Sequence, residues 1–250
     1  MRRSLALVVA LLAALVAAPS AAAITNGVPD GQRHPNVGGL VSPEQFSDGT
    51  WLYCSGTLIA PAVFLTAAHC GEDGERVQVT FDTAYQAGDA TYAGTFRADP
   101  RFGQRQNDPH DIAVVTLDAP VAGITPARLP EPGSLSALRN GARFTAVGYG
   151  AYEVTNGPGG HQFLYDDVRM VATGTLNAVN KAWLRISMNP STGNGGTCYG
   201  DSGGPNFLGD TDIVAAITIT GDAVCRATNV DYRLDTASAR AFLDDFVELP

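Results

Sequence analysis

The chain has 250 residues, of which 45% are hydrophobic and 16% charged, so it can bury a sizeable core, and a disordered chain is excluded. Its formal net charge of −9 argues against nucleic acid and anionic membranes as partners, because both repel an acidic protein. We interpret the acidic surface as a means of staying soluble outside the cell.

Residues 1–23 have the pattern of a secretory signal peptide. Two arginines precede an uninterrupted apolar run, Leu5 to Ala18, and small residues follow as far as Ala23. This run is shorter than the roughly 20 apolar residues that span a bilayer, which argues against a membrane anchor. We therefore expect cleavage near Ala23 and secretion of a mature chain, 24–250, with 14 basic and 25 acidic residues and a net charge of −11.

Most of the chain after this leader alternates between apolar and polar residues, as half-buried strands do. In 77–82, two valines and Phe81 are expected on one side and Thr80 on the other. Turn signals are frequent among 28 glycines and 15 prolines, and the glycine-rich segment 156–160 is interpreted as an exposed mobile loop. The chain is therefore predicted to be all-β, with closed or sandwiched sheets. Further β-rich apolar runs are 113–117, 144–147 and 213–219.

A proline-bearing segment, 126–141, separates two strand-rich halves and is typical of a connection between domains. We place the boundary there, which gives one unit of about 24–130 and another of about 131–235. One helix is predicted over about 236–247. Asp235 or Thr236 can cap this helix. Its apolar face would consist of Phe242, Leu243, Phe246 and Val247.

Four cysteines in an exported chain predict two disulfides. Three pairings are possible, and proximity in sequence favours Cys54 with Cys70 and Cys198 with Cys225. Zinc is the alternative use, but no Cys-x-x-Cys pair occurs and the four histidines are scattered, so no metal is expected. Calcium would need a recognisable loop, and solvated loop charge is the preferred interpretation of the acids that follow the second cysteine. Those acids are Glu72, Asp73, Glu75, Asp82 and Asp89.

Three short motifs carry the residue types of nucleophilic catalysis. They are Thr-Ala-Ala-His-Cys ending at Cys70, Asp-Ile-Ala-Val-Val starting at Asp111, and Gly-Asp-Ser-Gly-Gly-Pro around Ser202. A serine hydroxyl needs a base within hydrogen-bonding reach and donors directed at the oxyanion that it creates. Taken singly, His69 is better interpreted as a core histidine and Asp111 as a turn cap. Their joint occurrence in this order favours a catalytic triad.

In residue identity and in order, these motifs resemble those of the chymotrypsin and trypsin family of serine proteases. The resemblance covers residues 24–247. The resemblance implies two six-stranded antiparallel Greek-key β-barrels, a C-terminal helix, and a secreted, bacterial-type endopeptidase that needs no cofactor. It also implies that His69 is the general base, that Asp111 orients it, and that Ser202 is the nucleophile of an acyl-enzyme. The backbone N–H groups of Gly200 and Ser202 would form the oxyanion hole.

The resemblance gives Asp201 a separate role. In this family the corresponding carboxylate pairs with the amino terminus that activation creates, and here the candidate terminus is Ile24, in Ile-Thr-Asn-Gly. Since Ala21-x-Ala23 is itself a plausible signal-peptidase site, export would expose Ile24 directly. Our hypothesis is an enzyme that is active once secreted.

Substrate selection in this family depends on the pocket floor six residues before the nucleophile, which is Gly196, followed by Thr197. No acid stands there, so an uncharged pocket for an apolar or small side chain is expected. Asp222 and Asp231 stay open as acids that approach the pocket from the region around Cys225.

The family's Ser-Trp-Gly strand, which lines the cleft, is replaced by Ile219-Thr220-Gly221, or by Thr218 and Thr220 in a shifted register. The replaced serine normally donates a hydrogen bond to the catalytic aspartate. Its loss is therefore expected to leave Asp111 less well satisfied and to slow the enzyme.

Protein or peptide substrates and protein protease inhibitors are the expected partners of a monomer that has no membrane contact after signal removal. Two alternatives stay open: a non-catalytic binding protein on the same scaffold, and an esterase. The Gly-x-Ser-x-Gly signature of α/β-hydrolases is absent around Ser202, and the order His, Asp, Ser differs from theirs.

Overall fold

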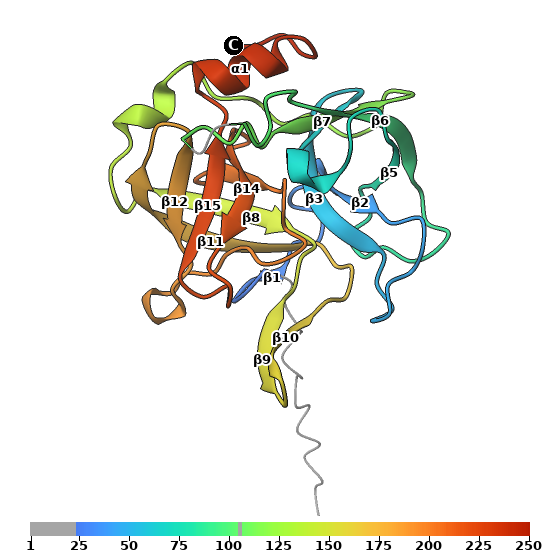
Figure 1. The fold of residues 1–250 in the computed structure, drawn as a ribbon, viewed down its shortest axis with the longest axis vertical. Helices are drawn as coiled ribbons and strands as arrows, with labels where there is room; N and C mark the ends of the chain where they lie inside the picture. Colours follow the sequence, from blue (N-terminus) through green and yellow to red (C-terminus); the bar gives the residue numbers. More distant parts are fainter. Residues whose placement is uncertain (1–23, 105–106) are drawn as a thin grey trace, which may run out of the picture.

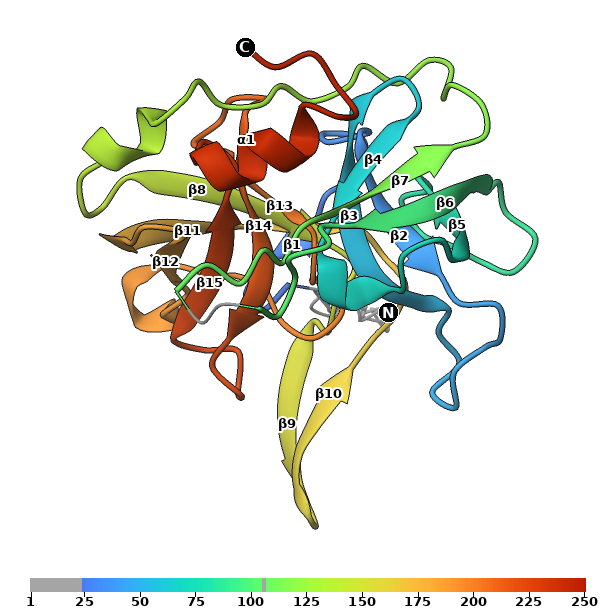
Figure 2. The same cartoon turned by 45° about the horizontal axis from the view of Figure 1, so that its top comes forward.

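Two closed β-barrels lie side by side in the computed structural model, which describes residues 24–104 and 107–250 (Figures 1 and 2). The expected signal peptide, 1–23, lies outside the described residues. Both barrels contain six antiparallel strands, so the predicted all-β fold with two six-stranded barrels is confirmed.

The first barrel has the strand order β2-β3-β4-β7-β6-β5 and closes through pairing of β2 with β5. Its interior is filled by alternating apolar side chains such as Leu40, Phe64 and Val114, all fully buried. Thr80, expected on the solvent side, is buried, because barrel closure covers it and its Oγ1 donates to the Ala90 carbonyl at 3.1 Å. The strands are β2 (Val37–Val41), β3 (Leu52–Ala60), β4 (Val63–Thr66), β5 (Arg76–Thr80), β6 (Tyr92–Ala98) and β7 (Ala113–Leu117).

The second barrel has the order β8-β11-β12-β15-β14-β13 and closes through two pairings of β8, with β11 and with β13. Phe144, Leu184 and Ile217 are among its buried residues. Its strands are β8 (Arg143–Gly148), β11 (Met170–Val179), β12 (Trp183–Ser187), β13 (Pro205–Leu208), β14 (Val214–Gly221) and β15 (Thr228–Arg233).

The amino-terminal segment lies against the second barrel, where β1 (Val28–Pro29) pairs with β11. The two residues that follow β1 are held by the fully buried Arg169. Its guanidinium donates to Asp30 Oδ2 at 3.0 Å and to the Gly31 carbonyl at 2.7 Å. The same guanidinium donates to the Val37 carbonyl in the first barrel at 3.0 Å. One arginine therefore fastens the amino-terminal segment to both barrels.

The helix α1 (Ala237–Leu243) begins where the sequence indicates, because the Thr236 hydroxyl accepts from the Ala239 N–H at 3.2 Å. It ends four residues before the predicted end at residue 247. Phe246 nevertheless packs against the core. The described residues also contain three 3₁₀ turns: η1 (Ala68–Cys70), η2 (Ser134–Ala137) and η3 (Pro190–Thr192).

The glycine-rich segment 156–160 is largely exposed, as expected, but only residues 158 and 159 form a turn and the others belong to strands. It forms the tip of a hairpin between β9 (Glu153–Gly157) and β10 (Gly160–Leu164), which projects from the body in Figure 1. Val154 is buried at the base of this hairpin, in a cluster that also contains Cys198. Packing at the base and ladder bonds along the arms outweigh the low strand propensity of the tip.

Candidate active site

A cleft of about 720 Å³ is lined by residues from both barrels. The first barrel contributes His69 and Cys70, and the second contributes Gly200, Ser202 and strand β14. The structure thus brings the predicted base and the predicted nucleophile to one surface, although 133 positions separate them in sequence.

His69 lies in the turn η1, and Asp111 holds it at two points. His69 Nδ1 lies 2.8 Å from Asp111 Oδ2, and the His69 backbone N–H donates to Oδ1 at 3.0 Å. The Asp111 side chain is 9% exposed and that of His69 is 33% exposed, so the carboxylate is shielded while the ring reaches the cleft. The Cys54–Cys70 disulfide ties η1 to β3 and fixes where the ring stands.

Ser202 lies in a tight turn between two glycines whose backbones are left-handed, Gly200 at φ 94° and Gly203 at φ 77°. Side chains rarely adopt such φ values, and a Cβ at Gly203 would overlap Thr66. The Ser202 carbonyl accepts from the Ser55 N–H at 2.9 Å, which anchors the turn to the first barrel. The hydrogen bonds of the described residues do not include one between Ser202 and His69, although both line the cleft; such bonds commonly tighten only when substrate is bound.

Two backbone N–H groups at this turn are free. Gly200 N and Ser202 N donate to no acceptor within the described residues, while Asp201, Gly203 and Gly204 all donate to carbonyls. A hydrogen bond from Ser55 Oγ to the Gly200 carbonyl at 3.0 Å holds this peptide in place. Free, oriented donors beside a serine are what stabilisation of an oxyanion requires.

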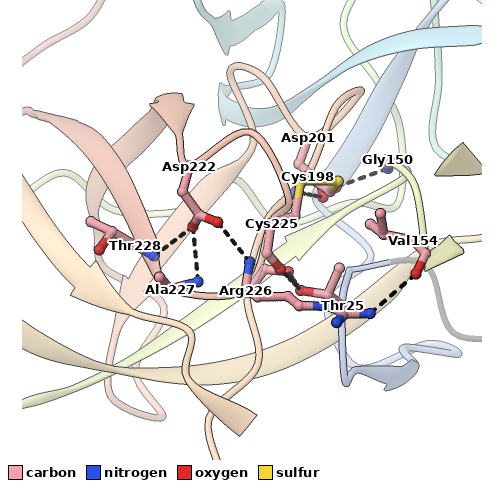
Figure 3. Close-up of a disulfide and its surroundings, with 11 residues drawn as sticks. Thr25, Gly150, Val154, Cys198, Asp201, Asp222, Cys225, Arg226, Ala227 and Thr228 are labelled. Atoms are coloured by element: carbon pink, nitrogen blue, oxygen red, sulfur yellow. Dashed lines mark hydrogen bonds between the residues drawn. A yellow bond between two sulfur atoms is a disulfide. The ribbon is translucent and has the colours of Figure 1, made fainter. Parts of the chain in front are cut away.

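Asp201 is fully buried beneath this turn. Its carboxylate accepts from the Gly150 N–H and from the Cys198 N–H, each at 2.8 Å (Figure 3). Burial raises the pKa of Asp201 to about 7, and these two hydrogen bonds offset that rise only in part. No salt bridge reaches Asp201 within the described residues.

Ile24 is also fully buried, in a cluster with Ala146 and Met170. The next residue lies along the pocket segment, because the Thr25 carbonyl accepts from the Gly196 N–H at 3.0 Å and Thr25 Oγ1 donates to the Cys225 carbonyl at 2.9 Å (Figure 3). Residues 24 and 25 thus lie against the segment that leads into the turn bearing Ser202. A contact between Ile24 and Asp201 is not among the hydrogen bonds or ion pairs of the described residues.

Four of the five predicted pocket residues line the cleft, and Gly196 does not. Gly196 is buried against Met188, whose side chain occupies the space that a Cβ would need. The Cys198–Cys225 disulfide, paired as expected, joins the two segments at this end of the cleft. The four residues that line it are Thr197, Ile219, Thr220 and Gly221.

Asp222 lines the same end of the cleft, but its carboxylate is already bonded. It accepts from the N–H groups of Arg226 at 3.1 Å, Ala227 at 2.8 Å and Thr228 at 2.7 Å, which closes the loop after β14 (Figure 3). These hydrogen bonds lower the pKa of Asp222 against the opposing effect of desolvation.

A buried polar cluster that the sequence does not predict is formed by side chains of β13, β14 and β15. Asp231 Oδ1 accepts from Asn206 at 2.7 Å, Asn229 at 2.6 Å and Thr218 at 3.3 Å. The available signal was the pair of polar residues at 229 and 231, two positions apart and so on one face of a strand that runs into the core.

Among the described residues, one group has metal-ligand spacing: Cys54, His69 and Cys70. Both cysteines are bonded to each other in a disulfide, so they have no thiolate to offer a metal. The acids considered for calcium do not form such a group in the described part of the chain.

Within 24–104 and 107–250, no helix combines the length and apolar character needed to cross a membrane.

The sequence matches the trypsin family over residues 35–241. Brachyurin of Leptuca pugilator is 31% identical over 200 residues, covering 73% of this chain and 85% of the relative. Chymotrypsin of Phaedon cochleariae is 28% identical over 187 residues, covering 70% of this chain and 65% of the relative. Both relatives are animal proteins, so they give no support to the expected bacterial type.

Solved structures share the fold at lower identity. HL collagenase superimposes with a TM-score of 0.69 at 18% identity, covering 90% of this chain and 100% of the other. HBP gives a TM-score of 0.67 at 17% identity, covering 91% and 98%. At this identity the likeness establishes the architecture of two barrels and not the chemistry.

Proposed function

The chain belongs to the trypsin family of serine endopeptidases, and we propose that it hydrolyses peptide bonds through an acyl-enzyme on Ser202. The observation that carries this proposal is the double contact of Asp111 with His69, in a cleft that Ser202 and two free N–H donors also line. A histidine with a purely structural role would be expected in the core rather than at the surface of such a cleft.

In this mechanism, Asp111 Oδ2 holds the proton on His69 Nδ1, so that Nε2 is free to accept the Ser202 hydroxyl proton as Oγ attacks the scissile carbonyl. The oxyanion that forms is stabilised by the N–H groups of Gly200 and Ser202. His69 then donates its proton to the leaving amine as the C–N bond breaks. Water, deprotonated by the same ring, hydrolyses the acyl ester and restores Ser202.

Activation follows from export in this proposal. Removal of residues 1–23 would create an α-ammonium on Ile24, which would pair with the buried Asp201 carboxylate. The pair would supply the cation that Asp201 lacks in the uncleaved chain and would secure the turn bearing Gly200. Amino-terminal sequencing of the secreted protein tests this step: a start at Ile24 supports it, and a start several residues earlier contradicts it.

The working enzyme is proposed to act as a secreted monomer. It would take protein or peptide substrates and, at the same cleft, protein protease inhibitors.

Labelling with a fluorophosphonate tests the reaction. The wild-type protein should be labelled stoichiometrically and Ser202→Ala not at all, with matching circular dichroism spectra showing that both are folded. Absence of labelling in a folded wild-type protein would instead indicate a binding protein on a protease scaffold. Cleavage of casein separates a protease from an esterase, which would hydrolyse simple esters alone.

A further inference from the structure

The residue just before the proposed catalytic aspartate has an unusual backbone conformation. His110 lies at φ 49°, in the left-handed region that residues other than glycine seldom adopt. Its carbonyl accepts from the Ile112 N–H at 2.9 Å, so a three-residue turn is centred on Asp111. A strained conformation of this kind persists only where surrounding contacts hold it, and such conformations cluster at functional sites. The contacts of His110 therefore decide how Asp111 is presented to the cleft.

The His110 ring is buried, and its nearest polar partner is on the C-terminal helix. The residue is 5% exposed, and Nδ1 lies 3.0 Å from Ser238 Oγ, which is hydrogen-bonding distance. Ser238 lies in the first turn of α1. Buried apolar residues of this helix, such as Phe242, belong to the same core cluster as Ile112. The helix therefore has both a polar and an apolar link to the turn that carries Asp111.

Two carboxylates also lie near the ring, but both have closer partners. Asp99 Oδ2 and Asp108 Oδ1 lie 3.6 and 3.7 Å from the ring Nδ1, beyond hydrogen-bonding distance. Arg101 donates to both oxygens of Asp99, at 2.9 and 2.7 Å. The Tyr232 hydroxyl donates to Asp108 Oδ1 at 2.9 Å. Among the described residues, the hydroxyl on α1 therefore makes the shortest polar contact with this ring.

A second contact ties the same helical residue to the first barrel. Arg101, which follows β6, donates to the Ser238 carbonyl at 3.3 Å while it also holds Asp99. The Asp99 N–H in turn donates to the Ile112 carbonyl at 3.0 Å. Ser238 is thus bonded through its hydroxyl to the residue before Asp111 and through its carbonyl to the segment after β6.

We propose that Ser238 and His110 form a positioning pair, whose hydrogen bond fixes the turn that directs the Asp111 carboxylate at the catalytic imidazole. This inference rests on the proposed function, since it has meaning only if Asp111 supports His69 as the base. Asp111 contacts His69 at two points, at 2.8 and 3.0 Å, so a displaced turn weakens both contacts at once. The helix α1 therefore influences turnover although none of its residues lines the cleft.

The first test removes the hydroxyl, with kinetics on a peptide amide that the wild type cleaves and with active sites counted by fluorophosphonate. Ser238→Ala should lower kcat roughly 10-fold and leave KM within about twofold, because a misplaced catalytic group weakens the transition state rather than substrate binding. A pair that only stabilised the helix would change the melting temperature and leave kcat as it is. Ser238→Thr keeps a hydroxyl and should restore kcat to within about threefold of the wild type.

The matched control is Thr236→Ala. It removes the cap of the same helix, where the hydroxyl accepts from the Ala239 N–H, and leaves the contact between Ser238 and His110 in place. It should lower the melting temperature and keep kcat within about twofold.

A double-mutant cycle distinguishes a shared contact from two independent effects. His110→Gly removes the ring, and glycine adopts the left-handed backbone without strain. If the pair acts through its hydrogen bond, the double variant His110→Gly/Ser238→Ala should lose no more than about twofold in kcat beyond the larger single loss. Losses that multiply would show that the two residues act separately and would overturn the pair.

The remaining outcomes are equally decisive. An unchanged kcat in Ser238→Ala, or an equal loss of kcat in Thr236→Ala, overturns the proposal even if His110→Gly does not fold. Failure of the proposed function looks different, because the wild-type protein itself would cleave no peptide and Ser202 would not be labelled.

Discussion

At the scale of single residues, three buried carboxylates of this site differ in what satisfies them. Asp111 has a histidine ring, Asp201 has two backbone N–H groups, and Asp231 has three side-chain donors on one oxygen. A buried charge is retained only where its partners offset the cost of desolvation. The shortfall at Asp201 is the one that the proposed α-ammonium of Ile24 would offset.

Asp111→Asn tests the role of the histidine partner. The amide would present a donor or an uncharged oxygen to His69 Nδ1, so the ring would take the wrong tautomer and lose its electrostatic support. We expect kcat to fall on the order of 10⁴-fold with little change in KM. The matched control is Asp118→Asn, which removes an acid paired with Arg76 at the exposed surface. It should leave kcat within about twofold, and an equal loss in both variants would contradict the assignment.

At the scale of elements, the features that depend on residues close together in sequence were predicted correctly. The hydroxyl of Thr236 caps the helix as its position before the apolar face suggested, and sequence proximity identified both disulfides. The three motifs could be recognised because each consists of a few consecutive residues, with small residues beside the histidine and the serine. Asp111, by contrast, reaches His69 only because β7 pairs with β4, a strand about 50 positions earlier in the sequence.

Features that depend on distant strands escaped prediction. The strands β9 and β10 pair across a short turn and were missed for a different reason, which is the low strand propensity of the glycines at their ends. Thr80 has the sequence pattern of an exposed strand residue, but the pairing of β2 with β5 buries it. The cluster around Asp231 draws on three strands, so no short window contains it.

The two disulfides give a prediction at this scale. They close segments of 16 and 27 residues. From loop entropy alone, the stabilising free energies of the two disulfides differ by less than about 0.5 kcal/mol, in favour of the longer loop. Replacing either pair with alanine should therefore lower the free energy of unfolding by about 3 kcal/mol and the melting temperature by roughly 6–12 °C. Urea titrations of both double variants measure this. A difference of several kcal/mol between them would mean that native-state packing, rather than the unfolded chain, dominates.

At the scale of the whole molecule, the amino-terminal segment links the barrels to the active site. Arg169 fastens residues 30 and 31 to both barrels, and Thr25 binds the pocket segment and the carbonyl of Cys225. Cleavage before Ile24, as proposed, would change the charge at one end of a segment that is already in place. In the proposed activation, we therefore expect an electrostatic change at Asp201 rather than a rearrangement of the fold.

The pH dependence of stability tests this coupling, by comparing a chain that begins at Ile24 with one that retains three alanines before it. In the extended chain, burial raises the pKa of Asp201 to about 7 from a value of 3.8 for the exposed group. The native state then holds a proton that the unfolded state releases, so stability falls as pH rises from about 4 to about 7. In the chain that begins at Ile24, the α-ammonium keeps Asp201 ionised and removes that loss. Its own stabilisation disappears above about pH 8, where the amino group loses its proton.

The gap between the melting temperatures of the two chains should therefore be small near pH 4 and widest between about pH 7 and pH 8. Asp201→Asn in the extended chain is the control, because it removes the titrating group and should flatten the curve from pH 4 to pH 7. Other buried acids, such as Asp231, contribute equally to both chains and cancel in the comparison. Melting curves that stay parallel across this range would show that the new amino terminus does not reach Asp201.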